Sequence, residues 1–352
     1  MKLPELTIDD LTVPVPIVQG GMGVGISLAS LSGNVAKEGG IGIISAAQIG
    51  FKRADFFDHP IKANLAQIPL ELEKARKIAP NGVLGFNIMV ATNRYEEYVQ
   101  AAIKAGADVI ISGAGLPLKL PALAQNSKTK IAPVISSAKA AKILLHYWEK
   151  HFDLTADFII VESPAAGGHL GFSYDEAEMP LADFDQELPK ILKIVARFRD
   201  KYQKSIPVLF AGGVYDQKDI LHYLALGCSG VQMASRFVTT KECDAPASFK
   251  EAYLNATAED IQIIKSPVGM PGRAIHNPFT EKIKSGPIPP QHCYQCLSRK
   301  HCDRKTIPFC ISKSLIDSAA GDAQNGLVFA GSTVARLKEM TTVHELMKEL
   351  TE

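Results

Sequence analysis

The sequence lacks several features that would place the chain in a specialised class of protein. It has no excess of one charge, because 38 basic residues stand against 37 acidic ones and the net charge is +1. A surface that binds nucleic acid through excess charge is therefore not expected. The N-terminus has acidic side chains and no long apolar core, and no apolar run reaches the length of a membrane span. We expect a cytoplasmic protein with a small-molecule substrate and with neither a nucleic-acid nor a membrane partner, and the sequence leaves a homodimer open.

Cysteine is scarce and unevenly distributed. Of six cysteines, four lie close together at Cys293, Cys296, Cys302 and Cys310. In a reducing compartment such clustering points to metal binding more than to disulfides. The first pair has the short spacing of metal ligands, but the second pair is more widely spaced than in a standard zinc ribbon. Zinc, an iron–sulfur cluster and a reduced packing motif all stay open.

Short apolar runs recur along the chain and alternate with segments whose apolar residues return at helical spacing. Such runs are too short for helices and too continuous for half-exposed strands, so they fit buried parallel strands. Eight of them favour an α/β fold of the (β/α)8 TIM barrel type over an open doubly wound sheet. The expected strands are residues 16–19, 41–45, 83–87, 109–112, 131–135, 158–161, 207–211 and 230–233, and helical segments include residues 26–37, 94–105, 138–150, 188–202 and 217–226.

The composition changes after the eighth unit. Residues 266–290 are rich in glycine and proline, and the cysteine cluster follows them. Turn residues at this density do not fit a ninth unit. The sequence therefore predicts a barrel domain over residues 1–265 and a C-terminal cysteine-rich helical appendage over residues 266–352, closed by helices within residues 328–350.

The end of the sixth expected strand carries the most informative loop. Glu162 and Ser163 follow the apolar run, and Gly167 and Gly168 precede His169. In a β/α barrel the active site lies at the carboxyl ends of the strands, and an imidazole there can exchange protons near neutral pH. A histidine with purely structural hydrogen bonds is the alternative. The acidic segment that follows, residues 173–189, is either a lid or a solvated loop.

Three further strand ends are informative, and two of them are rich in glycine. Residues 19–25 (Gln-Gly-Gly-Met-Gly-Val-Gly) lack the spacing of a dinucleotide fingerprint, so a Rossmann fold is disfavoured. Residues 211–214 (Ala-Gly-Gly-Val) and 232–236 (Gln-Met-Ala-Ser-Arg) follow the last two strands. In barrels these two loops frequently form a phosphate site from glycine amides and a helix N-terminus. The pair therefore predicts a phosphorylated ligand.

Five motifs together resemble one known family. Residues 19–23 (Gln-Gly-Gly-Met-Gly), 85–89 (Gly-Phe-Asn-Ile-Met), 166–171 (Ala-Gly-Gly-His-Leu-Gly), 211–214 and 230–237 (Gly-Val-Gln-Met-Ala-Ser-Arg-Phe) look like the nitronate monooxygenase (2-nitropropane dioxygenase) family of FMN barrels. That family includes flavin-dependent enoyl-acyl-carrier-protein reductases. The resemblance covers about the first 280 residues. The cysteine-rich tail departs from its better-known members.

The resemblance implies an FMN site and one catalytic residue. The phosphate is expected at Gly212, Gly213, Ala234 and Ser235, and the ring near Gln19, Gly20, Gly21, Met22, Asn87 and Ser112, with Gly168, Gln232 and Met233 completing the cofactor set. His169 falls on the family histidine, which in the monooxygenases is associated with removal of the α-proton of a nitroalkane.

Three functions follow as expectations. The leading one is an FMN-dependent oxidation of alkyl nitronates or nitroalkanes by dioxygen, with His169 as base. The second is an enoyl-thioester reductase that takes hydride from NADH or NADPH and works on substrates carried by acyl carrier protein. The third, of another class, is a flavin- or metal-binding sensor or assembly subunit without turnover.

Overall fold

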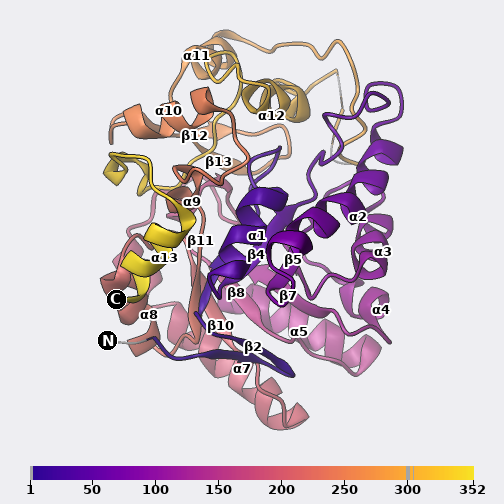
Figure 1. Cartoon of the computed structure of the whole chain (residues 1–352), viewed down its shortest axis with the longest axis vertical. Coiled ribbons are helices and arrows are strands. Elements are labelled where there is room, and N and C mark those ends of the chain that lie inside the picture. The colour runs from indigo at the N-terminus through magenta and orange to yellow at the C-terminus, as the bar shows by residue number, and fades with distance from the viewer. Residues whose placement is uncertain (1–2, 299–301, 304) are drawn as a thin grey trace.

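Eight parallel strands close into a barrel at the centre of the molecule (Figure 1). This computed structural model describes residues 3–298, 302–303 and 305–352. Every strand expected from the sequence is present within one residue of its predicted start and end, so the barrel prediction is confirmed. The barrel strands are β3 (Ile17–Gln19), β4 (Ile41–Ser45), β5 (Val83–Asn87), β6 (Val109–Ser112), β7 (Lys130–Ile135), β8 (Ile159–Glu162), β10 (Val208–Ala211) and β11 (Gly230–Met233).

Helices surround the barrel and begin or end at recognisable local signals. Ser137 accepts a hydrogen bond from the backbone of Ala140 and caps the helix over residues 138–152. Gly106, with φ of +88°, ends the helix over residues 95–105. The outer elements are α1 (Ala29–Lys37), α2 (Pro60–Ile78), α3 (Tyr95–Ala105), α4 (Leu120–Ala124), α5 (Ala138–Phe152), α6 (Leu181–Phe184), α7 (Leu188–Tyr202), α8 (Gln217–Ala225) and α9 (Ser235–Val238). The first predicted helix starts three residues later than expected.

The hydrophobic core has an inner and an outer layer. Side chains inside the barrel, such as Ile43, Ile111 and Leu209, form one buried cluster. An N-terminal hairpin, β1 (Leu6–Ile8) and β2 (Leu11–Val13), adds Leu6 and Val13 to this cluster. Figure 1 shows that the hairpin lies at the opposite end of the molecule from the C-terminal helices over residues 278–285 and 311–319. One end of the barrel is thus closed by apolar packing, and the other end is left for a site.

The appendage is joined to the barrel by a small antiparallel sheet. Its hairpin, β12 (Ile261–Lys265) and β13 (Pro271–Ile275), pairs with β9 (Gly168–His169) in the loop after β8. The hairpin spans the predicted domain boundary between residues 265 and 266, and the boundary itself stays a prediction. The remaining elements are α10 (Ala247–Asn255), α11 (Pro278–Ser285), α12 (Ile311–Ala319), the 3-10 turns η1 (Glu176–Glu178) and η2 (Val334–Arg336), and α13 (Val343–Thr351).

One expectation about a peripheral segment needs correction, and one open alternative can now be compared with the structure. Of residues 328–350, only η2 and α13 are helical, so the predicted C-terminal helices are shorter than expected. The acidic segment over residues 173–189 presents most of its carboxylates to solvent, and no residue from 173 to 189 lines the cavity described below. It has the character of a solvated loop. Among the described residues, no helix is long and apolar enough to cross a membrane.

Candidate active site

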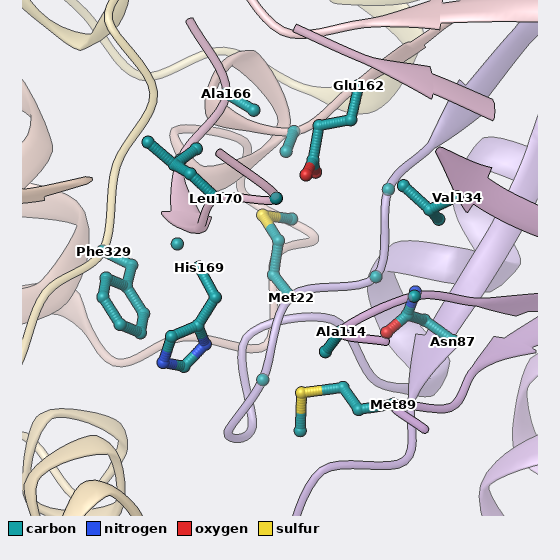
Figure 2. Close-up of a pocket in the computed structure, with 18 of the residues that line it drawn as sticks. Met22, Asn87, Met89, Ala114, Val134, Glu162, Ala166, His169, Leu170 and Phe329 are labelled. Atoms are coloured by element: carbon teal, nitrogen blue, oxygen red, sulfur yellow. The ribbon is translucent and has the colours of Figure 1, made fainter. Parts of the chain in front are cut away.

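A cavity of about 970 Å³ lies at the carboxyl ends of the barrel strands (Figure 2). Its walls combine loops that follow the barrel strands with appendage residues such as Leu297, Ile311 and Phe329. Ligand pockets typically measure about 300–1,000 Å³. The cavity is therefore large enough for a cofactor and a substrate together, and it uses the barrel end that β/α-barrel enzymes use.

Two successive glycines after β10 form a left-handed turn in the cavity wall. Gly212 and Gly213 have φ angles of +93° and +82°. A Cβ atom on Gly212 would lie 2.5 Å from Ser163 Oγ and 2.7 Å from the backbone nitrogen of Ala166. Among the described residues, the backbone N–H groups of Gly212, Gly213 and Ala234 donate no hydrogen bond. Unpaired amides in such a turn are suited to an anion, so the turn fits the expected phosphate.

Two side-chain amides face the cavity without partners. The Oε1 atom of Gln232 is buried and accepts no hydrogen bond within the described part of the chain. The Asn87 amide also has no hydrogen-bond partner there. A Cβ atom on Gly21 would lie 2.3 Å from Asn87 Cβ, so glycine is needed to leave Asn87 its place. A buried amide oxygen without a partner is costly, and the polar edge of a heteroaromatic ring would satisfy both the Gln232 oxygen and the half-buried Asn87 amide. These residues therefore fit the expected flavin.

His169 stands at the cavity wall on β9. Its Nε2 atom lies 2.6 Å from Ser266 Oγ, and its ring meets the Phe329 ring edge to face at a centroid distance of 5.0 Å. The β13 residue opposite His169 is Gly272. Burial lowers the pKa of His169 to about 4. The imidazole is therefore neutral at pH 7, held by one hydrogen bond and one aromatic contact.

Arg273 ties the histidine loop to the appendage. Its Nη2 atom donates to the backbone oxygens of Pro164 (2.9 Å) and Ala177 (2.7 Å), and its Nε atom donates to that of Ala166 (3.2 Å). The guanidinium presents several donors in a fixed geometry, which suits three carbonyl groups from one loop region. Arg273 thus fixes the backbone on either side of the site without facing the ligand space itself.

Glu162 is the second titratable group of interest in the cavity. It ends β8, and burial raises the pKa of its carboxyl group to about 8. Figure 2 shows the carboxyl group directed into the cavity, with His169 on the other side of Met22. The pKa of Glu162 is therefore raised and that of His169 is lowered, which is the pattern of an acid and a base that share a site.

The structure brings most of the predicted site residues together. Those lining the cavity are Gly20, Gly21, Met22, Asn87, Gly168, His169, Gly212, Gly213, Gln232, Met233, Ala234 and Ser235. Their assignment to FMN and to catalysis stays a prediction.

Gln19 and Ser112 do not line the cavity, although they were predicted to. Gln19 is fully buried, and its amide exchanges hydrogen bonds with the backbone of Ile43 on β4. Ser112 Oγ lies 2.8 Å from the hydroxyl oxygen of Tyr95. Both side chains therefore stabilise the barrel beneath the site.

Sequence reasoning missed three contributors to the site. Glu162 was noticed as a strand end but was not given a role. Ser266 and Arg273 act through a hairpin about 100 residues away in sequence from the loop that they support. Only the run of turn residues after 265 hinted at that hairpin, and it did not indicate its partner.

The four clustered cysteines form no recognisable metal centre. All four are among the described residues, where no group of three His, Cys, Asp or Glu side chains is placed to hold a metal ion. Cys296 lines the cavity instead, and burial raises its pKa to about 11, which keeps it a thiol at neutral pH. The structure gives no support to the expected zinc or iron–sulfur site.

A family model described as nitronate monooxygenase matches residues 5–352. The chain belongs to the nitronate monooxygenase family. A probable nitronate monooxygenase of Staphylococcus aureus strain Newman is 26% identical over 316 residues, covering 79% of this chain and 81% of that protein. The family comprises oxidoreductases, so the chain is an enzyme, and the alternative of a subunit without turnover loses its support.

Other relatives carry different activities in their names. A Mycobacterium tuberculosis dehydrogenase of a hydroxy-methyl-oxo-octahydroindene-carboxyl-CoA is 27% identical over 286 residues, covering 81% of this chain and 70% of that protein. The structure of FabK from Thermotoga maritima has a TM-score of 0.72 at 24% identity and covers 96% of this chain and 92% of its own. The structure of nitroalkane oxidase from Streptomyces ansochromogenes has a TM-score of 0.70 at 19% identity and covers 96% of this chain and 95% of its own. At these identities the two structures show the shared fold.

Proposed function

We propose that this family member is an FMN-dependent oxidoreductase that oxidises alkyl nitronates with dioxygen. The observation that carries the proposal is the neutral His169, which faces a cavity that also holds unpaired backbone and side-chain amides. A neutral imidazole can accept or donate a hydrogen bond without adding charge. The unpaired amides supply what a flavin phosphate and ring need.

The chain's own residues divide the task of holding the cofactor. Backbone amides of Gly212, Gly213 and Ala234, with the Ser235 hydroxyl, would bind the phosphate. The amides of Asn87 and Gln232 would orient the ring above Gly20, Gly21 and Met22. Bound FMN supplies a two-electron acceptor that dioxygen can reoxidise.

His169 would hold and move the proton of the substrate. Its Nε2 atom is engaged with Ser266, so the imidazole is oriented before the substrate arrives. A pKa near 4 makes His169 a weak base. A nitronate is already deprotonated and needs only a hydrogen bond from the ring, whereas a neutral nitroalkane must lose a proton to it. We therefore expect nitronates to be the better substrates.

Oxygen consumption tests this proposal directly. FMN-loaded protein is mixed with propionate 3-nitronate, and dioxygen uptake is followed against protein heated beforehand. We expect saturable, substrate-dependent uptake. If dioxygen is consumed no faster than with the heated control, nitronate oxidation is not the function of this site.

The apolar wall contributed by the appendage favours a second candidate. The cavity lining includes the appendage residues Val268, Leu297, Leu315 and Phe329, against which an acyl chain would bury more apolar surface than a small nitronate. The CoA dehydrogenase reported above is named for an octahydroindene-carboxyl-CoA, which is larger than an alkyl nitronate. On this reading the enzyme is an enoyl-thioester reductase that uses NADH or NADPH, with acyl carrier protein as a partner.

Anaerobic mixing separates the two candidates. The FMN-loaded protein is mixed in turn with NADH, NADPH and propionate 3-nitronate, and the flavin absorbance is followed. Nitronate oxidation predicts bleaching by the nitronate. Rapid bleaching by a nicotinamide, followed by reoxidation on adding a crotonyl thioester, would instead establish the reductase.

A further inference from the structure

Glu162 is an acidic side chain in the wall of the cavity. It forms no hydrogen bond and no ion pair with any described residue. Its carboxyl group points into the cavity (Figure 2). A charged carboxylate in such surroundings is strongly disfavoured, whereas a protonated one can donate a hydrogen bond to a ligand.

Within the described part of the chain, no charged group stabilises an ionised Glu162. The strands that flank β8 are β7 and β10, and their only titratable residue is Lys130. Lys130 begins β7 at the far end of the barrel and pairs with Asp9 and Asp10. The other titratable side chains that line the cavity make no hydrogen bond or ion pair with Glu162; they are Tyr98, Lys139, His169, Tyr253 and Cys296. Loss of hydration alone accounts for the pKa of about 8.

We propose that Glu162 is a protonated carboxylic acid that donates a hydrogen bond to an acceptor atom of the bound FMN ring. The inference rests on the proposed function in taking the cofactor to be FMN. The ring is expected beside Asn87 and Met22, which line the same cavity as Glu162 (Figure 2). Glu162 also pairs in register with Ala211, next to the Gly212 turn that would hold the phosphate. An ionised carboxylate there would repel a phosphate. Both the ring and the phosphate of FMN would therefore favour the protonated form of Glu162.

The consequence is a link between FMN affinity and pH. If FMN binds only the protonated form, the dissociation constant rises tenfold for each pH unit above the pKa of Glu162 in the free protein. Below that pH the affinity does not respond to Glu162. Glutamine in place of Glu162 keeps a donor and cannot ionise, so it should remove the dependence.

Titration of FMN-depleted protein with FMN at pH 6.5 to 9.5, followed by flavin fluorescence, tests the inference. The proteins are the unmutated chain, Glu162→Gln, Glu162→Ala and the control Glu259→Gln, which removes a fully exposed carboxylate. Between pH 8.5 and 9.5 the unmutated chain and Glu259→Gln should lose about tenfold in affinity, and Glu162→Gln less than twofold. The ionisations of FMN itself are common to all four.

The alanine variant separates the hydrogen bond from simple neutrality. At pH 7 Glu162→Ala should bind FMN roughly two- to tenfold more weakly than Glu162→Gln, which corresponds to one hydrogen bond. Parallel pH profiles for the unmutated chain and Glu162→Gln would overturn the inference, as would equal affinity of the alanine and glutamine variants at pH 7. Circular dichroism checks folding, and if Glu162→Ala does not fold, the glutamine profile decides alone. Failure of the unmutated chain to bind FMN at pH 7 would refute the proposed cofactor itself.

Discussion

Replacement of Gly212 by alanine should damage both the fold and the cofactor site, for separable reasons. The backbone at Gly212 has φ of +93°, where a non-glycine residue costs about 1–2 kcal/mol. The new Cβ would also lie 2.5 Å from Ser163 Oγ and 2.7 Å from the Ala166 nitrogen. The second contact is with backbone, which cannot swing away, and overpacking of this kind costs about 1–3 kcal/mol. The sum is a loss of about 2–5 kcal/mol in the free energy of unfolding.

Gly106 provides the matched control. Its φ is +88°, nearly that of Gly212, but nothing lies within 4 Å of a Cβ atom placed there. Gly106→Ala should therefore cost only the conformational part, about 1–2 kcal/mol. Urea unfolding of the FMN-depleted proteins measures both losses on one scale. The difference between the two variants is the energy of crowding at the glycine turn.

FMN binding gives an independent measurement on the same two variants. A shifted turn would misplace one or two amides that bind the phosphate, at about 1.5–3 kcal/mol each, so Gly212→Ala should bind FMN at least about tenfold more weakly. Gly106→Ala should bind FMN as the unmutated chain does. Equal stability losses in the two variants would refute the crowding argument, and unchanged FMN affinity in Gly212→Ala would remove that turn from the phosphate site.

Three further predictions concern His169 and its support. His169→Asn should keep its FMN and oxidise a neutral nitroalkane about 10²–10⁴-fold more slowly in steady-state oxygen uptake, with a much smaller loss on a preformed nitronate; equal losses would show that His169 positions the substrate and does not take its proton. The folded pKa of His169, about 4, lies below the usual 6.5, so the neutral ring contributes stability above pH 6.5 that is lost as the pH falls toward 4. Compared with His169→Asn in urea unfolding, the unmutated chain should lose stability over that range by at most about 1.4 kcal/mol per pH unit, and a constant difference would contradict the low pKa. Arg273→Lys cannot reach three carbonyls and should destabilise the fold by about 3 kcal/mol while lowering kcat more than FMN content, and unchanged kcat would show that the histidine loop holds itself in place.

The barrel was predictable because each of its strands carries its own signal. The run over residues 109–112 is fully buried, consists of apolar residues up to the polar Ser112 that ends it, and follows a helix that ends at Gly106. These are local features, and eight repetitions of them leave few topologies to consider. The glycine turn at Gly212 and Gly213 was predictable for the same reason, since a left-handed turn needs glycine wherever it lies.

The environment of each site residue was not predictable in this way. The sequence could not show that the side chains of Gln19 and Ser112 point into the barrel wall. Adjacent strand residues face opposite sides, so an error of one residue in the expected strand end reverses the side that a residue faces. Nor could it show that Glu162 has no partner among the described residues, because this depends on which side chains the neighbouring strands and loops place beside it. Residue types at strand ends therefore suggested which chemistry is available, and only the packing shows which groups remain unsatisfied and open to a ligand.

The strongest non-local effect is the pairing of β9 with β13. Two residues, Gly168 and His169, join the edge of a hairpin whose own strands lie in the C-terminal part of the chain. Antiparallel pairing fixes the direction of the His169 side chain, Ser266 fixes the ring, and Arg273 holds the preceding backbone. The same appendage supplies Leu297 and Phe329 to the cavity wall. One segment thus both orients the histidine and shapes the substrate space, so changes in the appendage can alter which substrates fit while the barrel and its glycine turn stay the same.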